Sequence, residues 1–190
     1  MKYYQEITLL SGEDVSANFL MSKIFQKVHL AIVEGRKNNS SANYAVSFPQ
    51  YTDTCIGEKL RIFSNSQENM ENLHLADRFS KLSDYVHWTG VRVVPVKKIK
   101  GTVVFCRYRN NGNPEALARR YAKRHDCSYE EALLRYKYDE SSSNLPYIIV
   151  ESSSTGKKFS LFIRKKEVTN YEKCEFDYYG LGDGEGVPDF

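Results

Sequence analysis

Residues 19–35, FLMSKIFQKVHLAIVEG, show a clear helical pattern and decide how the neighbouring elements are arranged. Apolar side chains recur there every three or four positions, at Leu20, Ile24, Val28 and Ala31. This spacing places them on one stripe of an amphipathic helix. Ser11 and Asp14 offer helix-start chemistry upstream, and Gly35 offers a stop. The segment therefore predicts a first helix with one buried face.

Strands are predicted on both sides of this helix. Residues 2–10 alternate as in a half-buried strand, with Tyr3, Ile7 and Leu9 on one face. Further strands are predicted at residues 44–48, 58–64 and 91–96. A second helix is predicted to begin with a capping box formed by Ser64 and Gln67 and to end near Ser83. The order strand, helix, strand, strand, helix, strand is typical of ferredoxin-like domains, which bind RNA, metabolites or metals.

The second half of the chain has a different composition. Residues 97–112 are basic and favour a strand, Asn113 and Pro114 predict the start of a helix, and a capping box from Ser128 to Glu131 predicts another helix to about Lys137. Residues 145–152 and 157–165 are expected to pair as a hairpin, and the glycine-rich tail forms a loop or a closing strand. We therefore predict an α+β protein with a ferredoxin-like domain at residues 1–97 and a basic domain at 98–190.

The bulk composition narrows the class of protein. The 190 residues are 41% hydrophobic and contain no apolar run of the length a membrane span needs. The first ten residues, MKYYQEITLL, do not resemble a secretion signal. The four cysteines are widely spaced without a CxxC pair, so we expect reduced thiols and no metal site. A cytoplasmic protein without a membrane partner or cofactor is predicted.

Positive charge is concentrated in one part of the chain. The net charge is only +3, but residues 91–137 hold twelve Lys and Arg against four Asp and Glu. The rest of the chain is therefore net negative. Such asymmetry favours a polyanion as the partner of one face.

The segment NPEALARRYAKRHD, residues 113–126, carries the densest part of this charge. At about 100° per residue its cations fall within an arc of about 140°. They are Arg119, Arg120, Lys123 and Arg124. Arg outnumbers Lys there, and guanidinium groups suit phosphates and guanine edges. Nucleic acid is the favoured partner of this helix, while a membrane surface, an acidic protein or plain solvation stay open.

Four further stretches carry a family resemblance. They are FLMSKIFQKVHLAIVEG with its late histidine, YAVSFP at 44–49, LPYIIVESSSTGKKFSLFIRK at 145–165 and YYGLGDGEGVPDF at 178–190. Together with the basic helix they resemble the CRISPR-associated endoribonuclease of subtype I-F, which cuts the repeat hairpin of precursor crRNA. The ending VPDF departs from the family's aromatic-rich VPWF.

The resemblance implies a metal-independent cut in which a 2′-hydroxyl attacks the adjacent phosphate and leaves a cyclic phosphate. His29 matches the general base, and imidazole as a class titrates near neutral pH. Ser152 matches the serine that holds the attacking ribose, Ser154 a supporting hydroxyl, and Tyr179 the tyrosine that orients the histidine. From the residues alone, His29 can be an ordinary interface residue, Ser152 part of a turn and Tyr179 part of the core.

The resemblance also implies how RNA is held. Arg107 matches an arginine that contacts a guanine near the foot of the hairpin, and Arg109 stands where the family has glutamine. The four cations of the basic helix match an arginine-rich helix in the major groove, and Phe159 matches an aromatic that stacks on the terminal base pair. The enzyme is expected to stay bound to the product within a crRNA-guided complex. The alternatives are a non-catalytic hairpin-binding subunit of such a complex or a general RNA-binding module.

Overall fold

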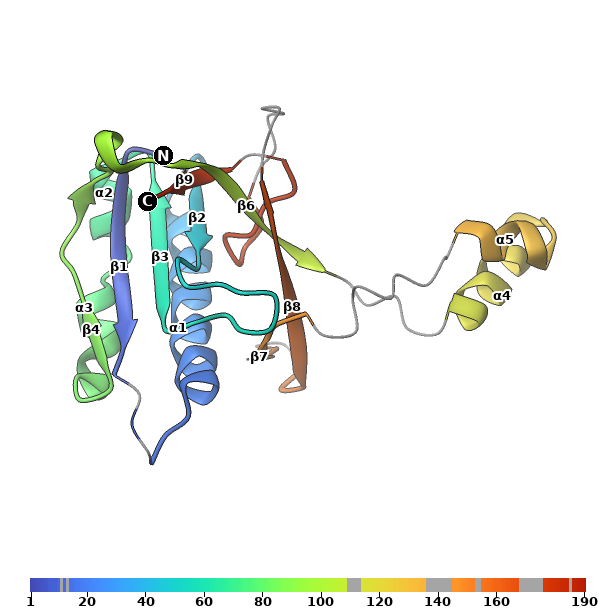
Figure 1. The fold of residues 1–190 in the computed structure, drawn as a ribbon, viewed down its shortest axis with the longest axis horizontal. Coiled ribbons are helices and arrows are strands. Elements are labelled where there is room, and N and C mark those ends of the chain that lie inside the picture. The colour runs from blue at the N-terminus through green and yellow to red at the C-terminus, as the bar shows by residue number, and fades with distance from the viewer. Residues whose placement is uncertain are drawn as a thin grey trace.

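A computed structural model describes residues 1–10, 12, 14–108, 114–135, 145–152, 155–167, 176–184 and 186–190. These residues form two antiparallel sheets together with helices, so the predicted α+β class is confirmed. Figure 1 shows helix α1 (Ala17–Asn38) along one face of the first sheet, with the second sheet beside it. Buried side chains from both halves of the chain form one continuous core. The long helix therefore lies where both sheets can contact it.

The first sheet follows the predicted order of elements. Its strand order is β2-β3-β1-β4, and β5 also pairs with β1. The strands are β1 (Tyr3–Leu9), β2 (Tyr44–Ser47), β3 (Lys59–Ser64), β4 (Val86–Trp88) and β5 (Arg92–Val93). Every pairing is antiparallel. This order puts β1 in the interior of the sheet, where it pairs with β3 on one side and with β4 and β5 on the other.

Helix α1 is longer than the sequence predicted. It begins after Ser16, whose hydroxyl accepts a hydrogen bond from the Phe19 amide, and it continues past Gly35 to Asn38. Gly35 is therefore not a stop. A Cβ at this position would lie 2.7 Å from the Tyr44 hydroxyl, so the glycine lets β2 approach the helix closely.

The predicted second helix is divided into three pieces. They are α2 (Gln67–Glu71), α3 (Leu75–Phe79) and the 3₁₀ turn η1 (Ser80–Leu82). The N-cap is Ser66, whose hydroxyl accepts from the Asn69 amide, and not Ser64, which ends β3. His74, with φ of 46°, interrupts the helix in a left-handed conformation. The apolar spacing was therefore correct, but the backbone turns between its halves.

The fourth strand was also misplaced. Val86–Trp88 forms β4, and only Arg92–Val93 of the predicted residues 91–96 forms a strand. Pro95 lacks the amide hydrogen that would continue the ladder, so it does not extend the strand. It instead precedes the 3₁₀ turn η2 (Val96–Lys98). Both short strands pair with β1, so the connectivity is kept.

Strand β1 is covered on both faces rather than one. The Tyr4 side chain, which the alternation of residues 2–10 puts on the face opposite Ile7 and Leu9, is only 9% exposed and meets the Phe190 ring edge-on at 5.1 Å. Arg61 lies over the Phe190 ring, 4.0 Å from its centroid, and donates from Nε to Glu6 at 2.7 Å. The last residues therefore cover the outer side of the first sheet.

The second sheet has the order β7-β8-β6-β9. Its strands are β6 (Gly101–Tyr108), β7 (Tyr147–Glu151), β8 (Lys158–Glu167) and β9 (Val187–Asp189). The β7–β8 hairpin was predicted, and the glycine-rich tail ends in the closing strand β9. Strand β7 is an edge strand that lies next to α1.

Helices α4 (Pro114–His125) and α5 (Tyr129–Arg135) pack against each other. Ala118 and Ala132 are fully buried, and Ser128 caps α5 by accepting from the Glu131 amide at 3.1 Å. The predicted cap at Asn113 and the end of α5 near Lys137 lie outside the described residues. The amphipathic helix expected here is therefore present.

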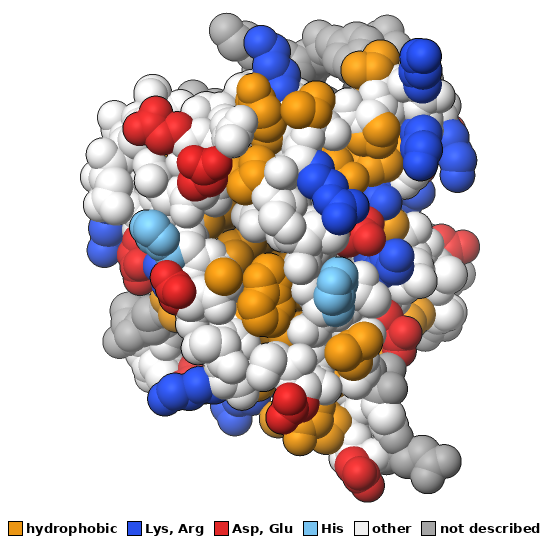
Figure 2. Space-filling view, turned by 90° about the vertical axis from the view of Figure 1, so that its left-hand side faces the viewer, with side chains coloured by type: hydrophobic (Ala, Val, Ile, Leu, Met, Phe, Trp, Pro, Cys, Tyr) orange, Lys and Arg blue, Asp and Glu red, His pale blue; other side chains and the backbone are white. Residues whose placement is uncertain are grey.

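Charged side chains are unevenly distributed over one face of the molecule. Figure 2 shows the side that carries α2, α3 and β4, where hydrophobic side chains lie between charged ones. Lys and Arg gather at its upper right, and Asp and Glu are spread over the remainder.

Of the described thiols, Cys106 is buried, Cys55 is exposed, and none is in a disulfide.

Candidate functional site

His29 lies on the face of α1 that is turned toward the end of the chain. Its Nδ1 is 2.8 Å from the carbonyl oxygen of Tyr178. A carbonyl oxygen only accepts hydrogen bonds, so in the neutral ring Nδ1 carries the proton and donates it. Nε2 then keeps its lone pair, which is what a general base requires.

Tyr179 holds the other side of this imidazole. The two rings are stacked with centroids 4.1 Å apart and planes 17° apart. Behind Tyr179, the Phe25 ring is nearly parallel at 6.2 Å. Burial raises the pKa of the Tyr179 hydroxyl above its usual value of 10.0, partly opposed by the nearby Arg107 cation. The tyrosine therefore stays neutral at physiological pH.

A tight turn presents both of these partners to His29. The Oδ1 atom of Asp177 accepts from the amides of Tyr179 at 2.8 Å and Leu181 at 2.9 Å. Gly180, with φ of 72°, lets the turn reverse, and its carbonyl accepts from the Val46 amide at 2.9 Å. Strand β2 in the first sheet thus anchors the turn that contacts His29.

Arg36 makes a second connection to the same segment. It donates from Nη2 to the Phe176 carbonyl at 2.9 Å, and its guanidinium lies 5.3 Å from the Tyr178 ring centroid. Its Nε is buried without a hydrogen-bond partner among the described residues. The contacts of this half-buried side chain with the turn further restrict where Tyr178 can lie.

Ser152 and Phe159 approach His29 from the β7–β8 hairpin. Together with His29, Tyr179 and Glu151 they line a hollow of about 410 Å³. The Ser152 carbonyl accepts from Gly156 at 2.8 Å and its amide donates to Lys157 at 2.9 Å, so this residue also forms the hairpin turn. The arrangement brings a base, a hydroxyl and an aromatic ring to one hollow.

Arg107 lies next to this hollow. It is exposed near the end of β6, and its guanidinium is 5.5 Å from the centroid of the Phe159 ring. A cation held over an aromatic ring keeps its outward N–H groups available for hydrogen bonding.

The remaining predicted residues are elsewhere or outside the described chain. The four cations of α4 are exposed, and Arg119 makes a long ion pair of 3.8 Å with Glu115 and donates from Nε to the Glu115 carbonyl at 3.4 Å. Arg109 and Ser154 lie outside the described residues. The structure thus brings His29, Ser152, Tyr179, Phe159 and Arg107 together, while α4 belongs to a separate helix pair.

Several residues at this site were not predicted from the sequence. Val33, Arg36 and Lys37 line a second hollow beside His29, of about 460 Å³, together with Tyr178 and Tyr179. Helical spacing from His29 could have indicated them, because positions i+4, i+7 and i+8 share its stripe. Asp177 and the Tyr178 carbonyl have no comparable signal in the sequence. Every residue has a backbone carbonyl, so the residue type at 178 does not reveal that its carbonyl contacts His29.

Neither a metal site nor a membrane span is found in the described ranges. No group of three or more His, Cys, Asp and Glu side chains there is placed to hold a metal ion. No helix there is long and apolar enough to cross a membrane.

Comparison with known proteins identifies a family and two relatives that match this chain. The family described as "CRISPR-associated protein (Cas_Csy4)" matches residues 4–190. Two proteins named CRISPR-associated endonuclease Cas6/Csy4 align over the whole of this chain and of themselves. The one from Pseudomonas aeruginosa (strain UCBPP-PA14) is 33% identical over 194 residues, and the one from Escherichia coli (strain UTI89 / UPEC) is 31% identical over 192 residues.

The α+β fold and a match of this extent define a CRISPR-associated protein. The chain belongs to the Cas_Csy4 family. The resemblance drawn from the sequence motifs is thereby confirmed.

Proposed function

We propose that this protein is an endoribonuclease that binds the stem-loop of CRISPR repeat RNA and cuts at its base by attack of a 2′-hydroxyl. The names of both relatives support endonuclease activity in CRISPR RNA processing. The observation that carries the chemistry is the 2.8 Å contact of His29 Nδ1 with the Tyr178 carbonyl, because it leaves Nε2 unprotonated on a residue that lines the same hollow as Ser152.

In the proposed reaction, His29 Nε2 takes the proton of the 2′-hydroxyl as its oxygen attacks the adjacent phosphorus. The bond from phosphorus to the 5′-oxygen breaks, and that oxygen takes up a proton. The products are a 2′,3′-cyclic phosphate and a 5′-hydroxyl. Ser152 holds the attacking ribose, Ser154 supports it, and Tyr179 orients the imidazole. A positioned base contributes roughly 10²- to 10⁴-fold, and in-line orientation adds to this.

This reaction needs no metal ion in principle. The RNA supplies its own nucleophile, and a histidine supplies the base, so neither a metal-bound hydroxide nor a metal-held water has to be generated. The same requirement restricts the cut to RNA, because DNA lacks the 2′-hydroxyl.

The proposed grip on the hairpin has two parts. Phe159 stacks on the terminal base pair, while Arg107, held over that ring, contacts a guanine edge with its outward N–H groups. The exposed cations of α4, with Arg109, contact the stem, mostly at phosphates. The strand order of the first sheet supports a ferredoxin-like domain at residues 1–97, followed by an RNA-binding domain at 98–190 with α4 as its arginine-rich helix.

The proposed setting is the cytoplasm, where the protein stays bound to the processed crRNA as a subunit of a type I-F complex. Stacking and phosphate contacts survive the cut, because only the bond to the leaving 5′-oxygen breaks. These surviving contacts support retention of the hairpin.

The test is cleavage of a repeat hairpin RNA by the wild-type protein and by His29→Ala. We expect the variant to lose cleavage and keep binding, EDTA to leave wild-type cleavage intact, and a 2′-deoxy nucleotide at the cut to block cleavage without blocking binding. Full-rate cleavage by His29→Ala would refute the catalytic role. Tight binding by the wild type without any cleavage would instead identify a non-catalytic hairpin-binding subunit.

A further inference from the structure

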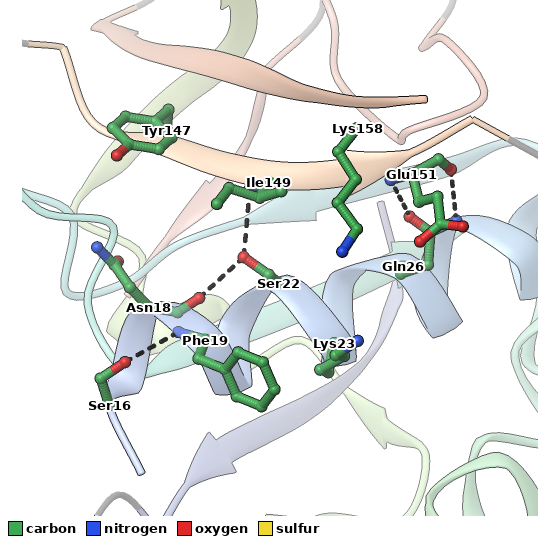
Figure 3. A pocket seen from close by; sticks show the side chains of 10 residues that line it. All are labelled: Ser16, Asn18, Phe19, Ser22, Lys23, Gln26, Tyr147, Ile149, Glu151 and Lys158. Atoms are coloured by element: carbon green, nitrogen blue, oxygen red, sulfur yellow. Dashed lines mark hydrogen bonds between the residues drawn. The ribbon is translucent and has the colours of Figure 1, made fainter. Parts of the chain in front are cut away.

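A second groove opens along α1 toward its start, away from His29. It has a volume of about 350 Å³, at the lower end of the range for ligand sites. Figure 3 shows its two walls, α1 on one side and the β7–β8 hairpin on the other. Phe19, Ser22, Lys23 and Gln26 come from the helix, and Tyr147, Ile149, Glu151 and Lys158 come from the hairpin. No role described so far uses this groove.

The groove is lined by exposed apolar side chains flanked by cations. Phe19, Tyr147 and Ile149 are 55%, 43% and 48% exposed. Lys23 lies over the Phe19 ring, 5.3 Å from its centroid, and the Lys158 side chain reaches toward the helix from the other wall (Figure 3). Aromatic faces beside ammonium groups are what a single-stranded nucleic acid requires, since bases stack on the rings and phosphates meet the cations.

The edge of β7 is not available to a pairing strand. The Ile149 amide donates to the Ser22 hydroxyl at 3.2 Å, the Glu151 amide donates to Gln26 Oε1 at 3.0 Å, and Gln26 Nε2 donates to the Glu151 carbonyl at 3.0 Å. Because α1 already satisfies these backbone groups, a partner protein cannot add a strand there. This favours an occupant recognised by its bases and charges.

The groove adjoins the candidate active site, because the two hollows share one lining residue. Glu151 lines both hollows, and Ser152 follows it directly. From His29 to Phe19 is ten residues of helix, about 15 Å. An RNA strand that leaves the phosphate between His29 and Ser152 can therefore enter the groove after passing Gln26.

We propose that this groove binds the single-stranded RNA on the 3′ side of the cut, with a base on Phe19 and Tyr147 and phosphates at Lys23 and Lys158. This inference rests on the proposed function. Contacts in the groove would make the protein bind the uncut precursor more tightly than the trimmed product, because only the precursor carries this strand. Glu151, the one acidic side chain that lines the groove in the described part, repels the passing strand and is partly offset by Lys158, its cross-strand neighbour.

The test compares three hairpin RNAs made uncleavable by a 2′-deoxy nucleotide at the cut: one that ends at the cut, one extended on the 3′ side and one extended on the 5′ side. We expect the wild type to bind the 3′-extended RNA more tightly than the trimmed one. Phe19→Ala should weaken binding of the 3′-extended RNA by roughly fivefold or more and leave binding of the other two RNAs unchanged. The double variant Lys23→Gln/Lys158→Gln should lower the salt dependence for that RNA by about 1.4 in log–log slope, and Lys81→Gln, from η1, serves as the matched control.

The outcomes separate this inference from the function it rests on. If no variant or wild-type protein binds the trimmed hairpin, the proposed function itself fails. If all of them bind it equally and the 3′ extension adds no affinity, the groove does not hold RNA. A gain from the 5′ extension alone would overturn the choice of strand. Lost binding of another complex subunit, with unchanged RNA affinity, would assign the groove to a protein.

Discussion

The imidazole of His29 lies flat on the ring of Tyr179, with centroids 4.1 Å apart, while its Nδ1 meets the backbone of the preceding residue at 2.8 Å. One contact fixes the plane of the imidazole and the other fixes its rotation and its tautomer. A histidine on an exposed helix face has neither constraint. The pair therefore converts an ordinary helical residue into one whose Nε2 has a defined direction.

The first prediction concerns the ring of Tyr179. Tyr179→Phe keeps the stack and should cut hairpin RNA at close to the wild-type rate. Tyr179→Ala frees one face of the imidazole and should slow cleavage by roughly 100-fold, the scale at which about 1 Å of misplacement acts. Single-turnover cleavage rates, with hairpin affinity measured alongside, test this. Equal rates for Tyr179→Ala and the wild type would show that the stack does not orient His29.

A second prediction concerns Asp177, which does not itself line the hollow beside His29 and Ser152. Its Oδ1 ties together the turn that presents Tyr178 and Tyr179. Asp177→Ala should lower the cleavage rate while hairpin affinity stays the same. Asp177→Asn keeps one acceptor oxygen and should recover much of the rate. The imidazole nitrogen NMR shifts of His29 should show a mixture of tautomers only in Asp177→Ala, and a single tautomer in both variants would contradict the assignment.

The sequence predicted the fold where local pattern determines local structure. The stripe of Leu20 and Ile24 gave α1, and the Ser128 capping box gave the start of α5. It was wrong where a distant residue decides the outcome. Gly35 resembles a helix stop, but it lies within α1, where the Tyr44 side chain leaves no room for a Cβ. The turn at His74 and the short strand Val86–Trp88 depend in the same way on pairing and packing that no short window contains.

For the candidate site, the family resemblance pointed to His29, Ser152 and Tyr179, and the structure brings them together. It could not point to the Tyr178 carbonyl, because any residue supplies one. Helical spacing could place Arg36 on the same stripe as His29. Its contacts with Phe176 and Tyr178 could not be predicted, because they depend on how the distant segment 176–178 packs against α1. Sequence motifs thus identify reactive side chains more readily than the backbone groups that orient them.

A third prediction concerns α4. Arg120→Glu with Arg124→Glu should abolish hairpin binding, because two attractive contacts with phosphates become repulsive. Both side chains are exposed, so urea unfolding should be unchanged. The matched control reverses two exposed lysines elsewhere, Lys2→Glu with Lys81→Glu, and should bind normally. Unchanged affinity in the α4 variant would return this helix to a merely solvated surface.

A fourth prediction uses two glycines with nearly the same backbone conformation. Gly180 and Gly156 have φ of 72° and 65°, so alanine at either costs about 1 to 2 kcal/mol in the left-handed region. A Cβ at Gly180 would also lie 2.8 Å from the buried Val46 side chain, whereas nothing lies within 4 Å at Gly156. Gly180→Ala should therefore lose about 1 to 3 kcal/mol more in unfolding free energy. Equal losses would mean that the turn is not anchored on β2.

The last prediction concerns alkaline pH. Burial raises the pKa of the hydroxyls of Tyr44, Tyr51 and Tyr179 above 10.0 in the folded protein. Below pH 10 these groups are protonated in both the folded and the unfolded chain, so their ionisation adds no pH dependence to the stability. Above pH 10 the unfolded chain releases these protons first, which favours unfolding. The unfolding free energy should therefore fall progressively as pH rises from about 10 through the folded pKa values.

Variants that replace these tyrosines with phenylalanine separate this effect from general alkaline damage. Tyr51 donates its hydroxyl to the Ile163 carbonyl at 2.9 Å, joining the loop after β2 to β8. Tyr51→Phe should therefore be less stable by about 1 kcal/mol at neutral pH, yet lose less stability between pH 9 and 11 than the wild type. Urea unfolding across this range measures both quantities. An unchanged alkaline slope in Tyr44→Phe, Tyr51→Phe and Tyr179→Phe alike would show that other groups control alkaline unfolding.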